Sequence, residues 1–251
     1  PRGQHQNQDP QNADQNPSFA PMLDFSAALA AAAVSDLPDT IAKYTDVNAI
    51  MRYVAVDRTI AHDDGPFHFY CGGGSTCTNH NFFWYQESVA PRLWLIAWDL
   101  DSSFNLDNAT TTLAFPWDDA SGPCEVRVFP PATLPLLPPL CDKLILGWAG
   151  MQKQYVDAVG EFLAGPCRSE PVDGLLNEWQ AQIRPVVEEA AIAHADAVTP
   201  AAWDAATAAL RSAIAELRQR AVARVAEGPK QIVDPWIVLD AGIPGDLDGG
   251  N

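Results

Sequence analysis

Two strand-like runs joined by a short loop constrain the fold of this chain more than any other feature. Residues 81–86 and 92–98 are rich in aromatic and aliphatic side chains, and residues 87–91 between them have the length of a hairpin loop. In an antiparallel hairpin, the start of the first strand lies beside the end of the second. We therefore expect Asn81 to lie near Asp99 and Asp101, which close the second run.

Two further acids, Asp63 and Asp64, end a helical pattern just before this hairpin. Carboxylate and amide oxygens are the ligands that Mg²⁺ and Mn²⁺ prefer. The segment therefore predicts half of a metal-dependent phosphotransfer site. The alternative is a simple turn, because Asp followed by Gly65 and Pro66 is also typical of turns.

The order of these pieces resembles a known family. An Asp-Gly pair after a helix, then HNFFWYQ, then IAWDLDSSFN, is similar to the CotH family of atypical protein kinases, named for a bacterial spore-coat protein. The resemblance implies a mainly helical α+β fold: a protein-kinase-like C-lobe with a β-hairpin carrying the metal site and a helical C-terminal subdomain.

The same resemblance implies roles for the polar residues. Asp64, or Asp63 beside it, would be the catalytic residue; Asn81 and Asp99 would bind the cofactor; and Asn81, Asp99 and Asp101 would hold the metal. The cofactors implied are ATP with Mg²⁺ or Mn²⁺. The partner implied is a surface or coat protein that accepts phosphate on Ser or Thr.

The chain also departs from the family pattern. Residues 66–80 form an insertion that lengthens the connection between the catalytic Asp and Asn81, which leaves the choice between Asp63 and Asp64 open. Asn105 stands where the family usually has Gly, a mild change because Asn tolerates a left-handed backbone. The resemblance spans about residues 21–226, and the nucleotide-binding Lys of the family's amino-terminal lobe has no counterpart before residue 21. We therefore expect a carboxy-terminal lobe portion and leave open whether this chain is active by itself.

Composition excludes several classes of protein. A hydrophobic fraction of 47% with eight Trp in 251 residues is typical of a folded domain. The net charge of −17, with only four Lys, argues against nucleic acid as a partner. Binding of a nucleotide polyphosphate would need divalent cations to bridge it to the carboxylates. No apolar run is long enough for a membrane span, because the Ala-rich residues 25–34 fall well short of the required length.

The five cysteines indicate an exported protein. Cys71 and Cys77 flank a short Gly-rich segment and favour a disulfide, while Cys124, Cys141 and Cys167 can supply one further bridge and a leftover thiol. Disulfides persist in oxidising compartments, so we expect an extracellular or cell-surface location in a bacterium. The alternative is a cytoplasmic protein with buried free thiols.

The rest of the sequence predicts two tails and several helices. Residues 1–20 predict a disordered polar tail, residues 21–236 the kinase-like domain, and residues 237–251 an acidic flexible tail. Apolar spacing predicts helices over residues 22–34, 47–62, 144–162, 175–191 and 201–225. Asp46 is expected to cap the second of these helices, and Pro185 to kink or split the fourth.

Other polar and aromatic residues have simpler interpretations. Asp118 and Asp119 lie in a Pro-rich stretch, residues 108–139, expected to be a long irregular surface loop; a solvated acidic loop is favoured there over an extension of the metal site. His68 and His80 are interpreted either as hydrogen-bond donors beside the site or as simple loop residues, and the loop interpretation is favoured. Trp84, Trp94 and Trp98 are interpreted as core.

Two other classes of function stay open. A non-catalytic surface or coat module would keep the fold and the metal without using ATP. A metal-dependent phosphohydrolase would also use clustered acids, but the chain lacks an HxH or HExxH pattern.

Overall fold

The computed structural model describes residues 19–72, 77–87, 92–104, 106, 117–118, 124–128 and 135–232. Within these residues the protein is mainly helical with two small antiparallel sheets, as an α+β fold requires. The α-helices are α1 Ala20–Ala31, α2 Leu37–Tyr44, α3 Val47–Thr59, α5 Lys143–Ala149, α6 Gln152–Ala164, α7 Ser169–Ala193 and α8 Pro200–Glu227. The strands are β1 Phe69–Cys71, β2 Cys77–Thr78, β3 Phe82–Gln86, β4 Leu93–Ala97, β5 Arg127–Val128 and β6 Pro135–Leu137.

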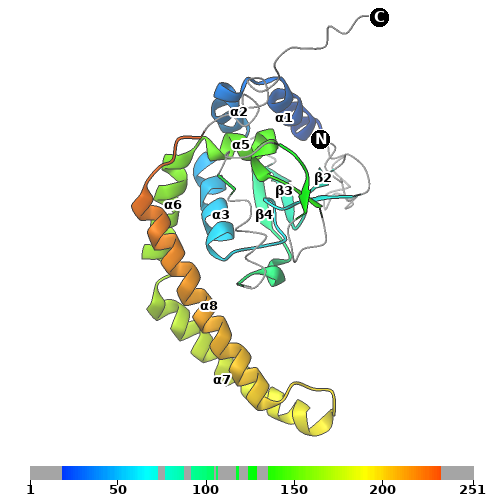
Figure 1. Cartoon of the computed structure of the whole chain (residues 1–251), viewed down its shortest axis with the longest axis vertical. Coiled ribbons are helices and arrows are strands. Elements are labelled where there is room, and N and C mark those ends of the chain that lie inside the picture. The colour runs from blue at the N-terminus through cyan, green and yellow to red at the C-terminus, as the bar shows by residue number, and fades with distance from the viewer. Residues whose placement is uncertain are drawn as a thin grey trace, which may run out of the picture.

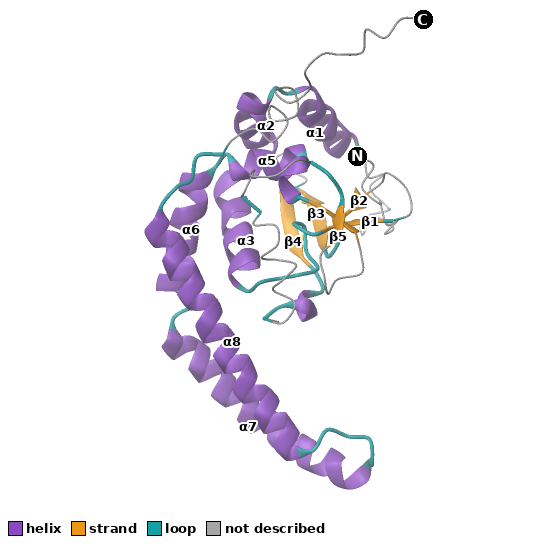
Figure 2. Ribbon diagram, viewed as in Figure 1, coloured by secondary structure: helices purple, strands orange, loops and turns teal. Residues whose placement is uncertain are grey.

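The core forms where α3 packs against α6 on one side and β4 on the other. Met51 and Val54 of α3, Val159 of α6 and Leu93 of β4 are all almost completely buried. Figure 1 shows α3 between the hairpin and α6, and Figure 2 shows the strands gathered beside the helices. The apolar face predicted for residues 47–62 is therefore the central face of the core.

Helix starts follow the chemistry of their capping residues. The carboxylate of Asp46 accepts a hydrogen bond from the backbone N–H of Ala49 at 3.0 Å, so the predicted cap of α3 is confirmed. Asp142 caps α5 in the same way, accepting from Leu144 at 2.9 Å and Ile145 at 3.2 Å. The helical spacing over residues 144–162 is interrupted at Gly150 and divides into α5 and α6.

The last two helices form an antiparallel pair that extends away from the body (Figure 1). Helix α7 runs continuously past Pro185, so the helix is not split there, and a kink at Pro185 stays a prediction. Arg184 beside it pairs with Asp204 of α8. No residue of α7 is buried, whereas Ala213, Leu217 and Ala221 of α8 are.

The predicted hairpin is confirmed. Strands β3 and β4 pair antiparallel from Phe82 opposite Ala97 to Gln86 opposite Leu93. Trp84 packs against the core as expected, but Trp98 is 56% exposed and its interpretation as core is wrong. A two-stranded hairpin covers the core with one face only, and Trp98 follows the outward-facing Ile96 by two residues.

The second sheet was not predicted. Its strand order is β2-β1-β6-β5, and it joins the insertion around Cys71 to the Pro-rich stretch. The expectation of an irregular loop over residues 108–139 is therefore wrong for β5 and β6, while Asp119 lies outside the described residues. The Cys71–Cys77 disulfide is present, as is a Cys124–Cys141 disulfide, which leaves Cys167 as a buried thiol. The preferred pairing and the leftover thiol are confirmed. Within the described residues, no helix has the length and apolar character needed to cross a bilayer.

Candidate functional site

The carboxyl end of β4 lies beside the start of β3 and brings the backbones of Asn81 and Asp99 close together. The backbone N–H of Trp98 donates to the carbonyl oxygen of Asn81 at 3.3 Å. Asp99 is the next residue, and Asp101 follows in a short 3₁₀ helix, Leu100–Ser102. The backbone of Asn81 thus contacts the residue that precedes Asp99. This end of the hairpin is the one that contacts Asp64.

Asp64 is the centre of this group. One carboxylate oxygen, Oδ2, accepts a hydrogen bond from Nδ2 of Asn81 at 2.8 Å. The other, Oδ1, accepts one from the hydroxyl of Tyr70 at 2.8 Å and lies 2.7 Å from Nε2 of His80. The Asp64 side chain is 29% exposed, so the carboxylate is oriented by three neighbours while remaining accessible to solvent.

Asp63 has different surroundings. Its backbone N–H donates to the carbonyl oxygen of Ser102 at 3.0 Å, and its carboxylate lies 3.4 Å from Nδ1 of His68. The same His68 nitrogen contacts the carbonyl oxygen of Asp63. The structure therefore brings Asp64 into contact with Asn81.

A buried polar group fixes the backbone beneath these two acids. Nδ1 of His62 lies 2.9 Å from Oδ1 of Asp57, and Arg58 binds the other Asp57 oxygen at 2.7 Å. Arg58 also donates to the carbonyl oxygen of His62 at 2.6 Å. Because Asp57 and His62 are only 3% and 0% exposed, the residues leading into Asp63 and Asp64 are held by contacts that water cannot easily replace.

Left-handed backbone conformations cluster around the site. Asn81, Asp99 and Phe104 have φ values of 60°, 50° and 61°. Asn and Asp adopt this region more readily than other residues, whereas for Phe it is costly and must be held by its surroundings. The N–H of Phe104 donates to the carbonyl oxygen of Ile60 at 2.8 Å, which ties this turn to the end of α3. Asn105, which was expected to tolerate such a conformation, lies outside the described residues.

Burial raises the pKa of Tyr70 well above its usual value, and the hydrogen bond to Asp64 raises it further. Tyr70 therefore keeps its proton throughout the physiological range and acts as a hydrogen-bond donor to Asp64.

The exposed acids fit an open cation site better than a closed one. Asp99 and Asp101 are exposed, and across the described ranges no three His, Cys, Asp or Glu side chains converge as a metal cage. Mg²⁺ commonly binds through one or two carboxylates together with waters and substrate phosphates. The hard oxygen donors of Asn81, Asp99 and Asp101 have the chemistry that such an open site needs.

Sequence reasoning missed Tyr70, which donates to Asp64. For His68 and His80 the favoured interpretation as simple loop residues is wrong, and the alternative of donors beside the site agrees with the contact that each makes to a carboxylate. The alternation of His68 and Tyr70 is typical of one face of a strand, and it was the available clue.

Asp118 lies away from this group and serves a structural role. It is 6% exposed and pairs with Arg224 of α8 at 3.1 Å and with Lys230 at 3.3 Å. Gln152 of α6 donates to the same carboxylate at 3.4 Å. The interpretation of Asp118 as part of a solvated acidic loop is therefore wrong.

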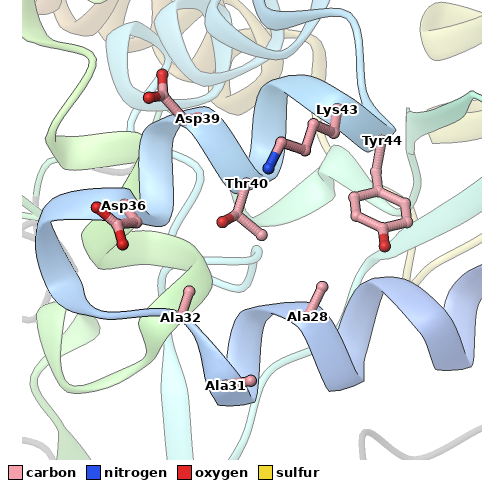
Figure 3. A pocket seen from close by; sticks show the side chains of 8 residues that line it. All are labelled: Ala28, Ala31, Ala32, Asp36, Asp39, Thr40, Lys43 and Tyr44. Carbon is pink, nitrogen blue, oxygen red and sulfur yellow. The ribbon is translucent and has the colours of Figure 1, made fainter.

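A hollow of about 390 Å³ lies between α1 and α2 and is separate from the carboxylate group. Figure 3 shows Thr40, Lys43 and Tyr44 of α2 facing Ala28 and Ala31 of α1 across it. All its lining residues fall within residues 28–44, so none of Asp64, Asn81 or Asp99 contributes to it.

The fold and the site define a mainly helical α+β protein with a carboxylate–amide pair at the end of a hairpin. The family model described as CotH kinase protein matches residues 2–221, and the chain belongs to this family. The match begins within the segment predicted as a tail and ends inside α8. No curated protein and no solved structure matches the chain.

Proposed function

We propose that this chain carries the catalytic and metal-binding part of a protein kinase that transfers the γ-phosphate of ATP to Ser or Thr of a protein. Membership of the CotH kinase family supports a kinase-related function in general. The observation that carries the proposal is the 2.8 Å hydrogen bond between Asp64 and Asn81, at the hairpin end where Asp99 follows.

Asp64 is proposed to orient the acceptor hydroxyl and take its proton. Phosphoryl transfer depends mainly on positioning and on charge stabilisation, so a carboxylate held by several donors suits this role. The three neighbours of Asp64 restrict its rotation, and its partial exposure leaves room for a substrate hydroxyl.

Asn81, Asp99 and Asp101 are proposed to hold the cation. Since Nδ2 of Asn81 is used by Asp64, its amide oxygen is the atom that a cation would contact. Asp99 and Asp101 are exposed and can supply carboxylate oxygens. A bound Mg²⁺ or Mn²⁺ neutralises charge on the nucleotide phosphates. In the described residues no Lys or Arg forms an ion pair with Asp99 or Asp101.

The proposed acceptor is an extracellular or coat protein. Two disulfides are compatible with an exported location. The family name connects the chain with spore-coat kinases. The net charge of −17 disfavours nucleic acid as a partner, because like charges repel. It favours a protein acceptor that can approach the acidic surface of this chain.

Calorimetric titration of ATP, with and without Mg²⁺ or Mn²⁺, tests the proposal together with transfer of radioactive phosphate to dephosphorylated casein. We expect Asp99→Ala to abolish metal-dependent ATP binding. Asp64→Asn should keep binding but reduce transfer by at least about 100-fold, since it removes the proton acceptor. Asp157→Asn is the matched control, because Asp157 is an exposed acid of α6 paired only with Lys153.

The result separates the kinase from the alternative function. Cation binding without ATP binding, both in this chain and in a longer chain that includes any preceding coding sequence, would contradict the proposal. It would favour a non-catalytic surface module instead. Unchanged transfer in both Asp64→Asn and Asp99→Ala would also refute the assigned roles.

A further inference from the structure

We propose that Tyr70 and His80 are positioning residues for the Asp64 carboxylate, and that the Cys71–Cys77 disulfide holds them in place. This inference rests on the proposed catalytic role of Asp64. It assigns a function to the insertion over residues 66–80, the part of the chain that departs most from the family pattern.

The contacts of Asp64 all come from the segment around this disulfide. Tyr70 immediately precedes Cys71, while His80 and Asn81 follow Cys77 by three and four residues. These three residues provide the contacts to the two carboxylate oxygens at 2.8, 2.7 and 2.8 Å. Each neighbour of Asp64 is therefore within four residues of a bridged cysteine.

The disulfide reinforces a strand pair that is very short. Strands β1 and β2 pair through only two positions, Tyr70 opposite Thr78 and Cys71 opposite Cys77. A two-stranded pairing of this length is marginal in water by itself. A covalent bond between the directly opposed cysteines keeps Tyr70 of β1 close to His80, which follows β2 by two residues, and restricts their separation.

Ring stacking then sets the direction of the Tyr70 hydroxyl. The Tyr70 ring lies between His68 and His80, with centroid distances of 4.5 Å and 5.2 Å and interplanar angles of 16° and 25°. Both rotation and translation of the phenol are limited by these flat neighbours. The hydroxyl is thereby directed at Oδ1 of Asp64.

The same segment is tied to the turn that carries Asp64. Nδ2 of Asn79 donates to the carbonyl oxygen of Pro66 at 2.6 Å. The turn containing Asp64 to Pro66 and the segment containing Asn79 to Asn81 are therefore joined through both backbone and carboxylate. Loss of the covalent bridge should loosen the hydrogen bonds to Asp64, because neither Tyr70 nor His80 is a member of the buried core cluster that would otherwise hold it in place.

Two variants test this arrangement, both in this chain and in a longer chain that includes any preceding coding sequence. Tyr70→Phe removes the hydroxyl and keeps the ring, and the double variant Cys71→Ser with Cys77→Ser removes the bridge. Matched controls are Tyr44→Phe, on the hollow between α1 and α2, and Cys124→Ser with Cys141→Ser, which removes the other disulfide. The readouts are kcat and the KM for ATP in phosphotransfer, and the NMR signal of the His80 ring nitrogens, assigned by a His80→Gln variant.

We expect the test variants to lower turnover and to leave nucleotide binding unchanged. Each test variant should lower kcat by about 10- to 100-fold, the range expected for a lost hydrogen bond to a charged group or a misplaced catalytic side chain. The KM for ATP should stay close to that of the wild type, and the His80 signal should shift. The two control variants should change neither kcat nor the His80 signal.

Two outcomes overturn this inference. One is a His80 signal that stays unchanged in both test variants, and the other is an unchanged kcat when the wild type is active. A wild type that binds and transfers nothing would refute the proposed function instead. The NMR signal would still decide whether the disulfide positions the neighbours of Asp64.

Discussion

Gly65 is the position where a single methyl group should disturb the candidate site most. A Cβ atom added there would lie 2.5 Å from Nδ1 of His62 and 3.0 Å from Oδ1 of Asp57. These are the two atoms of the buried 2.9 Å contact beneath the site. Because His62 is 0% and Asp57 3% exposed, neither side chain can move aside into solvent without cost.

The magnitude for Gly65→Ala follows from these contacts. Overpacking of a well-filled interior costs about 1–3 kcal/mol, and loss of a hydrogen bond to a charged group costs about 1.5–3 kcal/mol. The lower backbone entropy of Ala in the unfolded chain offsets about 0.4–1 kcal/mol. We therefore expect the free energy of unfolding to fall by about 1.5–5.5 kcal/mol.

Urea unfolding followed by tryptophan fluorescence measures this loss. Gly72→Ala is the matched control, because a Cβ there has no atom within 4 Å. The control should leave the unfolding free energy unchanged or raise it by at most about 1 kcal/mol. Equal stability of the two variants would refute the reasoning that the His62–Asp57 pair closely fills the space beside Gly65.

Two other predictions concern the rest of the fold. Asp118→Ala should lower the free energy of unfolding by about 3 kcal/mol, because it leaves the largely buried Arg224 without its carboxylate partner. Urea unfolding checks this, with Asp157→Ala as the control, because that variant removes an exposed ion pair worth at most about 1 kcal/mol. Equal losses of stability in the two variants would contradict the prediction. Burial raises the pKa of the Cys167 thiol, so less thiolate is present at a given pH. The native protein should therefore react with Ellman's reagent at one thiol only, and more slowly than glutathione does at pH 8. A fast reaction would contradict the burial of Cys167, and a second reactive thiol would contradict the disulfides.

Local patterns were sufficient for the elements that depend on local contacts. The apolar spacing after Asp46 predicts α3, and the aromatic runs predict the β3–β4 hairpin, because each pattern repeats over several residues within one element. The closeness of Asn81 and Asp99 follows from hairpin geometry alone.

Short strands with distant partners could not be predicted in the same way. Strand β1 has three residues and pairs with β6, which lies more than sixty residues further along the chain. The position of Tyr70 depends on that pairing. No periodic pattern develops over so few residues, so the contact between Tyr70 and Asp64 was invisible in the sequence.

Asp118 shows the same limit for a charged side chain. In sequence it belongs to a polar, Pro-rich stretch, where exposure is the usual expectation. Its partner Arg224 is 106 residues away, and the pair is buried because the end of α8 packs against α6. Burial of an acid is tolerated here because the opposite charge and Gln152 satisfy it.

The position and the orientation of Asp64 are set by separate groups of contacts. Asp57, Arg58 and His62 fix the backbone where α3 leads into the turn, and these residues are buried. Tyr70 and His80 instead orient the carboxylate, and neither is a member of the buried core cluster. A change to the buried group should therefore reduce both stability and turnover, whereas Tyr70→Phe should reduce turnover with little loss of stability. This difference distinguishes a residue that orients the carboxylate from one that supports the fold. Unfolding and kinetic measurements on both Gly65→Ala and Tyr70→Phe are sufficient to test it.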